Sequence, residues 1–382
     1  MDYRIFAKEH YNITALDSRE ISDPVVGLKE FLVGKSGESL KQDVQDLLIA
    51  VFEENGWRKH GTPLNLYRKT KDVAKLMDFV WLITIYRHER RGKQPNLERH
   101  YLYKQYQHRT FTGLFKRTPS KDKPLSVSAA ALAKEVFTKR HGLMLKSDIT
   151  NYWLPVAFNS SYMTNLTAKF HCIESSADVL DYRYLLLIVD AAFELANQPA
   201  ICRVTEKLGY YRLFATDADH LEWLSEETIE QPVAGLRYPF FYIAAARFPE
   251  AIRRWYALIS ESAHWDTHSD PGNILYVRES ILSLMEIGWL LSRLGFPKQD
   301  NSMPKRKYGN DLSAAETADP IGYALDFFEQ RRLCEWKQLL ETWLCQSLSD
   351  EDHPDTAVTE RDRESIIKLM QALQLIGYRA IA

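Results

Sequence analysis

The sequence predicts an all-α protein of four diverged three-helix modules, arranged either as a stacked, solenoid-like helical-repeat array or as two paired helical bundles. Three observations favour this fold. Segments of the chain match one another, and apolar residues recur at the spacing of amphipathic helices. In addition, 16 Gly and 15 Pro in 382 residues leave little room for the many turns of a β architecture.

The clearest internal match aligns residues 16–52 with residues 312–348 without a gap. Eight identical pairs fall in this alignment: Leu16/Leu312, Glu20/Glu316, Asp23/Asp319, Pro24/Pro320, Phe31/Phe327, Lys41/Lys337, Gln42/Gln338 and Leu48/Leu344. Further on, the run that begins at Arg278 and ends at Met285 matches the run from Arg363 to Met370, and Lys75-Leu-Met echoes Lys368-Leu-Met. Several matches in the same order indicate a repeat.

Each module is predicted to contain two long amphipathic helices with apolar residues at i, i+3, i+4 and i+7. The first helices carry Val44, Leu47, Leu48, Val51; Ile149, Tyr152, Trp153, Val156; Ile252, Trp255, Tyr256, Ile259; and Trp336, Leu339, Leu340, Trp343. The second helices carry Val73, Leu76, Met77, Val80; Leu185, Ile188, Val189, Ala192; Ile281, Leu284, Met285, Gly288; and Ile366, Leu369, Met370, Leu373. In the fourth module the gapless alignment places Val44 on Leu340, one turn later than Trp336, so two registers stay open there.

A shorter helix is predicted to open each module. Asp23-Pro24 and Asp319-Pro320 place an N-cap acceptor before a proline at the first helical position, and Gln231-Pro232 has the same form with a poorer cap. This helix carries an aromatic anchor, which is Phe31, Phe137, Phe240 or the pair Phe327–Phe328. The predicted limits are 1–90 for module 1, 91–200 for a basic segment with module 2, 201–298 for module 3 and 299–382 for module 4.

Composition and cysteine spacing together predict a folded protein in a reducing compartment. Hydrophobic residues make up 45% and charged residues 26%, which is too apolar for disorder. The charged residues 1–10 do not resemble a signal peptide, and the longest apolar runs are far shorter than a membrane span. The four cysteines form no C-x-x-C pair, and Cys334 and Cys345 fall on one predicted helix. We therefore expect a cytoplasmic protein without a membrane partner.

Charge is distributed unevenly along the chain. Residues 56–147 contain 21 Lys and Arg against six Asp and Glu, a net charge of +15, whereas the whole chain has −2 and the remainder therefore −17. The densest part, 99–123, interleaves cations with aromatic residues. Cations neutralise phosphates and aromatic rings stack on unpaired bases. The candidate nucleic-acid-binding residues are Arg99, Lys104, Arg109, Lys116, Arg117, Tyr101 and Tyr106. The other interpretation is a basic segment packed on the acidic later modules.

Three patterns that could carry other chemistry are better explained as structure. His264 and His268 lie with two carboxylates in the segment before Pro271, which makes them weak candidates for a metal site. Gly34-Lys35-Ser36 lacks the earlier glycine of a phosphate loop, because Lys29 stands there, so we expect a turn. The Arg-to-His spacing of HEPN ribonucleases occurs only between Arg4 and His10, outside the repeats.

The function predicted from the sequence is that of a non-enzymatic scaffold or adaptor. Stacked helices offer an extended surface to a protein partner, and no cofactor is expected. The alternative is a nucleic-acid-binding protein that uses 99–123, and the second alternative is a HEPN-like or metal-dependent hydrolase. Assembly into a homo-oligomer also stays open, because acidic loops could dock the basic segment of a second copy.

Overall fold

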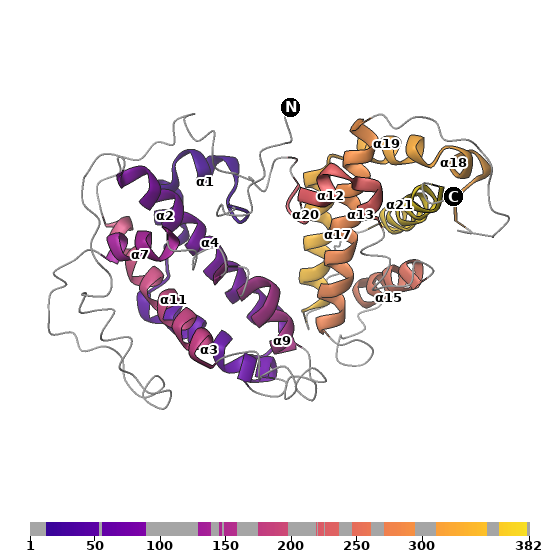
Figure 1. Cartoon of the computed structure of the whole chain (residues 1–382). Helices are drawn as coiled ribbons and strands as arrows, with labels where there is room; N and C mark the ends of the chain where they lie inside the picture. The colour runs from indigo at the N-terminus through magenta and orange to yellow at the C-terminus, as the bar shows by residue number, and fades with distance from the viewer. Residues whose placement is uncertain are drawn as a thin grey trace, which may run out of the picture. The chain divides into compact units, whose positions relative to one another are not determined.

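The computed structural model has helices as its elements throughout the part of the chain that it describes (Figure 1). The described residues are 13–52, 56–88, 129–138, 145–146, 149–158, 175–197, 219, 221–224, 226–236, 247–260, 271–294, 311–349 and 359–379. The predicted all-α class is confirmed. Across these ranges, a helix with both the length and the apolar character to cross a membrane is not found.

The chain divides into two compact units, an N-terminal unit of Ala7–Thr216 and a C-terminal unit that contains Asp217–Ala382. The division, between residues 216 and 217, lies inside the predicted third module, 201–298. The limits of the four modules inside these units stay predictions.

The N-terminal unit is centred on two long helices, α4 (Pro63–His88) and α11 (Ser175–Ala196), which contact each other. Their predicted apolar quartets are buried throughout. Around them pack α2 (Pro24–Phe31), α3 (Gly37–Phe52) and α7 (Ala129–Thr138). The shorter elements of the unit are α1 (Ser18–Ser22), η1 (Gly56–His60), the π-helical turn η3 (Ile149–Trp153) and α9 (Leu154–Phe158).

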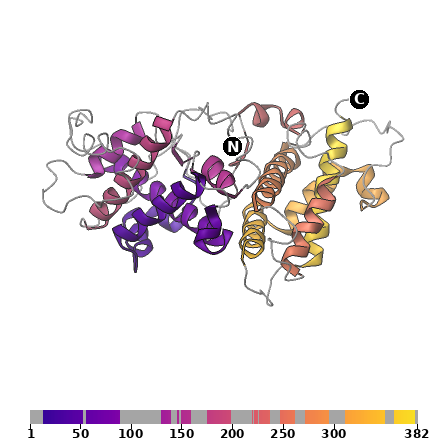
Figure 2. The ribbon, with the colours of Figure 1, turned by 90° about the horizontal axis from the view of Figure 1, so that it is seen from below.

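The C-terminal unit repeats this plan with α17 (Pro271–Leu294) and α21 (Glu360–Arg379) as its central helices. Helix α20 (Leu333–Ser347) lies against α17, and α15 (Phe248–Ser260) lies against α20 and α21 (Figure 2). The remaining helices are α12 (Glu226–Glu230), α13 (Pro232–Gly235), α18 (Ala314–Ala318) and α19 (Pro320–Gln330). The predicted quartets of α17 and α21 are buried.

Side-chain caps start the predicted opening helices, and a short helix precedes each of them. Asp23 and Asp319 accept hydrogen bonds from the backbone N–H groups of Val26 and Gly322, so both predicted N-caps are confirmed. Gln231 makes no such bond, as expected for the poorer cap. All three residues have nearly the same backbone angles, with φ/ψ of −134°/75°, −127°/75° and −130°/68°.

Both registers that the sequence left open in α20 have buried residues. Trp336, Leu340, Trp343, Leu344 and Ser347 are buried, whereas Leu339 is half-buried. The register of the gapless alignment, which starts the quartet at Leu340, therefore stays a prediction. The predicted aromatic anchors differ among themselves: Phe137, Phe327 and Phe328 are buried, Phe31 is half-buried, and Phe240 lies outside the described residues.

Candidate functional site

The site residues proposed from the sequence lie outside the described part of the chain. This holds for the nucleic-acid candidates Arg99, Tyr101, Lys104, Tyr106, Arg109, Lys116 and Arg117 and for the metal candidates His264 and His268. Their roles stay predictions. The described residues instead contain a set of buried carboxylates that connect helices.

The Gly34–Ser36 segment forms the turn between α2 and α3, as predicted. Gly34 has a φ of 76°, a left-handed conformation that glycine adopts without strain. Lys35 pairs with Asp72 on α4 at 2.5 Å, and the Ser36 hydroxyl accepts the backbone N–H of Ser39. Each polar group therefore has a structural partner.

Asp78 on α4 is the first of the buried carboxylates. Its side chain is fully buried and accepts backbone N–H bonds from Thr14 and Ala15 at 3.0 and 2.9 Å. The Lys146 ammonium donates to both carboxylate oxygens at 2.7 and 2.8 Å and to the Thr14 hydroxyl at 2.8 Å. Asp78 thus ties α4 to the segment before α1 and to the residue that leads toward η3.

Glu286 on α17 repeats this arrangement in the C-terminal unit. It too is fully buried, and its two oxygens accept the backbone N–H groups of Glu222 and Trp223 at 2.8 Å each. Lys337 on α20 pairs with it at 2.5 Å. Burial raises the pKa of Glu286, and the attraction of Lys337 opposes this rise. The residues that donate the backbone bonds precede the acid by 64 and 63 positions in both units.

A third pair joins Lys41 on α3 to Asp190 on α11 at 2.5 Å. The positions of the three pairs agree. Lys41 and Lys146 stand three residues before Val44 and Ile149, the first apolar residues of two predicted first helices. Lys337 stands three residues before Leu340, the residue that the gapless alignment places on Val44. Asp78, Asp190 and Glu286 each directly follow the third apolar residue of a predicted second helix, namely Met77, Val189 and Met285.

Within the N-terminal unit the two links are reciprocal. Lys41 on α3, in the predicted first module, pairs with Asp190 on α11, in the predicted second module. Lys146, in the predicted second module, pairs with Asp78 on α4, in the predicted first module. Both links cross between the two halves of the unit. They therefore fix how these halves pack.

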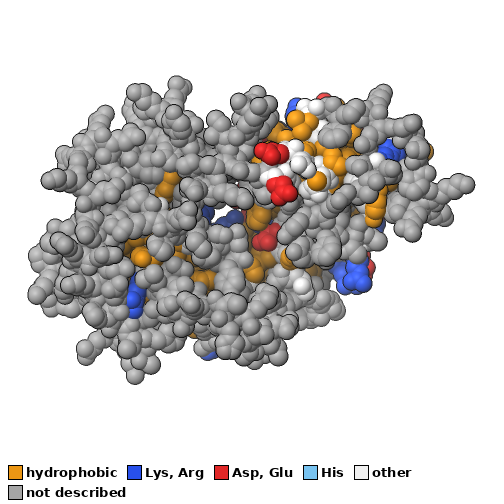
Figure 3. Space-filling model, in the orientation of Figure 1, with side chains coloured by type: hydrophobic (Ala, Val, Ile, Leu, Met, Phe, Trp, Pro, Cys, Tyr) orange, Lys and Arg blue, Asp and Glu red, His pale blue; other side chains and the backbone are white. Residues whose placement is uncertain are grey.

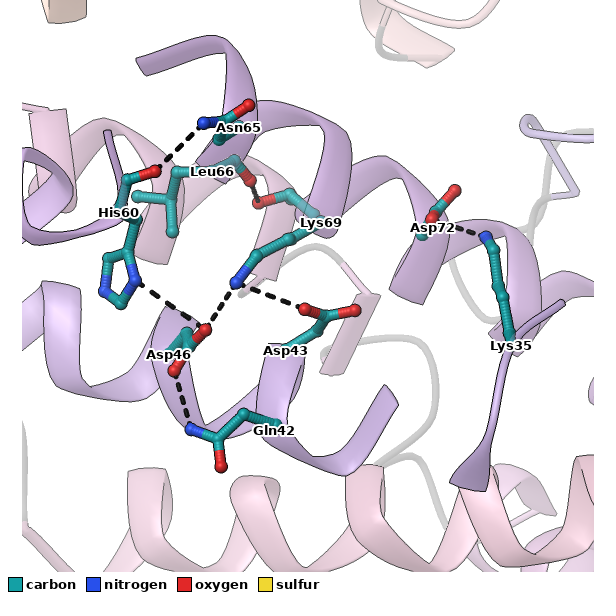
Figure 4. A network of polar contacts seen from close by, with 10 residues as sticks. Lys35, Gln42, Asp43, Asp46, His60, Asn65, Leu66, Lys69 and Asp72 are labelled. Carbon is teal, nitrogen blue, oxygen red and sulfur yellow. Dashed lines mark hydrogen bonds and ion pairs between the residues drawn. The ribbon is translucent and has the colours of Figure 1, made fainter. Parts of the chain in front are cut away.

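A separate polar network lies where α3, η1 and α4 meet (Figure 4). The Lys69 ammonium contacts Asp46 and, at 3.2 Å, Asp43. Burial alone would lower the pKa of Lys69, but the hydrogen bonds and charges of the two aspartates raise it. His60 Nδ1 lies 3.6 Å from an Asp46 oxygen, and the Asn65 side chain donates to the His60 backbone carbonyl. This network joins the end of η1 to α3 and α4.

The His60 position belongs to a motif that occurs twice. Trp57, His60 and Pro63 have the spacing W-x-x-H-x-x-P, and Trp265, His268 and Pro271 repeat it 208 residues later. In the described copy Trp57 is buried, His60 faces Asp46 and Pro63 begins α4. His268, in the second copy, lies outside the described residues, so its role stays a prediction.

Cys334 is a buried thiol at the start of α20. Its backbone N–H donates to Asp219 at 2.9 Å. Burial would raise the pKa of Asp219, but this bond and the charge of Arg332 lower it overall. Burial and the neighbouring Asp219 raise the pKa of the Cys334 thiol. The thiol therefore stays protonated near neutral pH, which does not favour a nucleophilic role.

These arrangements use their charged groups in holding helices together. Asp78 and Glu286 have no solvent-accessible surface, and their oxygens accept bonds from lysines and backbone N–H groups. A carboxylate in this state has no access to a substrate. In the described ranges, three or more His, Cys, Asp or Glu side chains placed to hold a metal ion are not found.

Sequence reasoning aligned Lys41 with Lys337 but assigned no role to either residue. It missed the acids completely. The available signal was an acidic residue directly after the apolar pair of three of the predicted second helices, at Asp78, Asp190 and Glu286.

No family model, curated protein or solved structure matches this chain.

Proposed function

We propose that this protein is a non-enzymatic scaffold that presents the surface of two module pairs to a protein partner. The observation that carries the proposal is the use of charge inside the helix packing, where Asp78 and Glu286 are fully buried and Asp190 is partly buried. The lysine–carboxylate pairs at Asp78, Asp190 and Glu286 join helices, and each stands at the same position of the repeat pattern. These pairs use charged groups to join helices, and the joined helices support the surface that the proposal assigns to a partner.

The same contacts support paired bundles over a continuous array. In the N-terminal unit α3 contacts α11 while α4 contacts α9, and in the C-terminal unit α15 contacts α21 while α17 contacts α20. In each case a first helix packs on the second helix of the other module, in both directions. Two modules related in this way complete one core, which explains why each unit is compact.

The test of the scaffold function is reconstitution of a defined complex. The full chain, used as bait, is expected to retain a protein partner through gel filtration, and the two purified proteins are expected to bind with micromolar or tighter affinity. Two exposed apolar side chains, Val33 and Leu294, are suitable probes, because their exposed fractions are 78% and 51%. Val33→Ser and Leu294→Ser leave the core unchanged, so weaker binding by either variant maps the contact. Failure to reconstitute any complex from purified components would refute the scaffold function.

A nucleic-acid-binding function is the second candidate, and charge on the described surface favours it. Arg58, Lys59, Arg68 and Lys71 are exposed on η1 and α4, inside the basic stretch 56–147. By contrast, acidic side chains gather over α12 in the C-terminal unit (Figure 3). Opposite charge on different parts of one chain suits a polyanion at the basic part.

Fluorescence anisotropy with labelled single-stranded and duplex DNA and RNA tests this second candidate. Binding at about 150 mM salt that weakens steeply with added salt would support it. A charge-reversal variant at Lys104, Arg109, Lys116 and Arg117 is then expected to lose the binding. Absence of binding, or equal binding by the variant, would assign the basic segment to packing.

A further inference from the structure

The fourth position of the lysine–carboxylate pattern is occupied differently from the other three. Pro249 stands three residues before Ile252, where the other first helices have lysine, and Gln371 directly follows Met370, where the other second helices have an acid. Both charges of the link are therefore missing together. This comparison rests on the module pairing proposed above.

A different ion pair joins the same two helices to the segment before α18. Arg253, one helical turn after Pro249, contacts both oxygens of Asp311 at 3.1 Å. The Gln371 side-chain amide donates to Asp311 at 2.7 Å. Compared with the other three links, the cation stands one turn later on the first helix. The acid lies in the segment before the short helix α18 and not on the central helix.

The Arg253–Asp311 pair is much more exposed than the Lys337–Glu286 pair of the same unit. The side chains of Arg253 and Asp311 are 48% and 36% exposed, whereas those of Lys337 and Glu286 are 12% and 0% exposed. Exposed ion pairs are screened by salt and contribute little to stability, whereas buried pairs are screened far less. In addition, the buried Gln371 side-chain oxygen has no hydrogen-bond partner. The ion pair at the α15–α21 corner is therefore more open to screening by salt than the Lys337–Glu286 pair between α17 and α20.

We propose that the C-terminal unit contains a conformational device at this corner: α15 is a strap that opens from α21 while α17 and α20 stay joined by the Lys337–Glu286 pair. The strap closes over apolar groups. Ile252, Trp255 and Ile259 are buried against the unit, and the Trp255 indole donates to the Ser347 hydroxyl at 3.0 Å. Opening exposes this apolar face, and the Arg253–Asp311 pair sets how often it occurs.

Hydrogen exchange of the full chain at about 50 mM and about 1 M salt tests the proposal, with α3 as the internal reference for a first helix held by the less exposed Lys41–Asp190 pair. The α15 amides are expected to exchange at least threefold faster in high salt, while the α3 and α20 amides change by less than this factor. Arg253→Gln is expected to give the fast rate already in low salt and to remove the salt dependence. The matched control is Arg254→Gln, whose partner Glu250 lies on the same helix, and it is expected to behave as wild type.

Two results would overturn the strap. One is exchange in α15 that salt and Arg253→Gln leave unchanged, and the other is an equal response of α15 to Arg254→Gln. A second variant keeps the test decisive if the first folds poorly: Asp311→Asn removes the same link from its other end and must give the same rates. These outcomes are independent of the scaffold function, which fails only if no complex can be reconstituted.

Discussion

Removal of Lys337 tests whether buried charge holds the C-terminal unit together. Lys337→Met keeps most of the apolar length of the side chain but leaves the fully buried Glu286 without its cation. Loss of one partner of a buried ion pair costs about 3–5 kcal/mol in the free energy of unfolding. For a unit of this size the melting temperature is expected to fall by roughly 6–20 °C.

The loss of unfolding free energy in Lys337→Met, called the deficit below, is also expected to depend on pH. The folded-state pKa of Glu286 is raised, so the folded unit holds this proton more tightly than the unfolded chain, in which Glu titrates near about 4.3. The stability from this difference is present at low pH and is lost as the pH rises through the folded pKa. Without Lys337 the pKa rises further. The deficit of Lys337→Met is therefore larger at pH 7.5 than at pH 5.

The assay is urea unfolding at both pH values, followed by hydrogen exchange of the α17 and α20 amides so that the signal reports on this unit. Arg254→Met is the matched control, because its pair with Glu250 is exposed and contributes about 0.5 kcal/mol or less. A deficit for Lys337→Met below about 1 kcal/mol, or one equal to that of the control, would refute the reasoning. A deficit that grows toward low pH would refute the linkage argument alone.

Three further predictions concern helix ends and turns. Asp319→Ala removes the side-chain cap of α19 and is expected to lower the free energy of unfolding by about 1 kcal/mol, measured by urea unfolding. Gln231→Asp introduces at α13 the cap that its counterparts have and is expected to raise stability by roughly 0.5–1 kcal/mol, and an unchanged midpoint would contradict this. Gly34→Ala is expected to cost about 1–2 kcal/mol through its positive φ alone, because no other atom lies within 4 Å of the added methyl group, and thermal unfolding checks it.

The fold class and the long helices could be predicted because their signal is local. The quartets of α4, α11, α17 and α21 recur at helical spacing, and each apolar stripe is formed by neighbouring residues of one helix. The caps at Asp23 and Asp319 are also local, since acceptor and donor are three residues apart. The register of α20 is a different case, because apolar spacing does not choose between Trp336 and Leu340 and both side chains are buried.

The buried acids could not be predicted from spacing, because their partners are distant in the sequence. Asp78 and Lys146 are 68 residues apart, and a charged residue inside an apolar helix pattern gives no indication of which residue satisfies it. Only the packing of two modules brings the pair together. For the same reason, the sequence predicted a stacked array and left paired bundles open as the alternative.

The central claim is that module pairs are joined by reciprocal lysine–carboxylate links, and double-mutant cycles on the N-terminal unit test it most directly. The cycles combine Lys41→Met with Asp190→Asn, and Lys146→Met with Asp78→Asn, and the crossed pair of Lys41→Met with Asp78→Asn is the control. Coupling energies of about 1–3 kcal/mol are expected for the two matched pairs, against additivity within about 0.5 kcal/mol for the crossed pair. Additivity in both matched pairs, or equal coupling in the crossed pair, would contradict the claim.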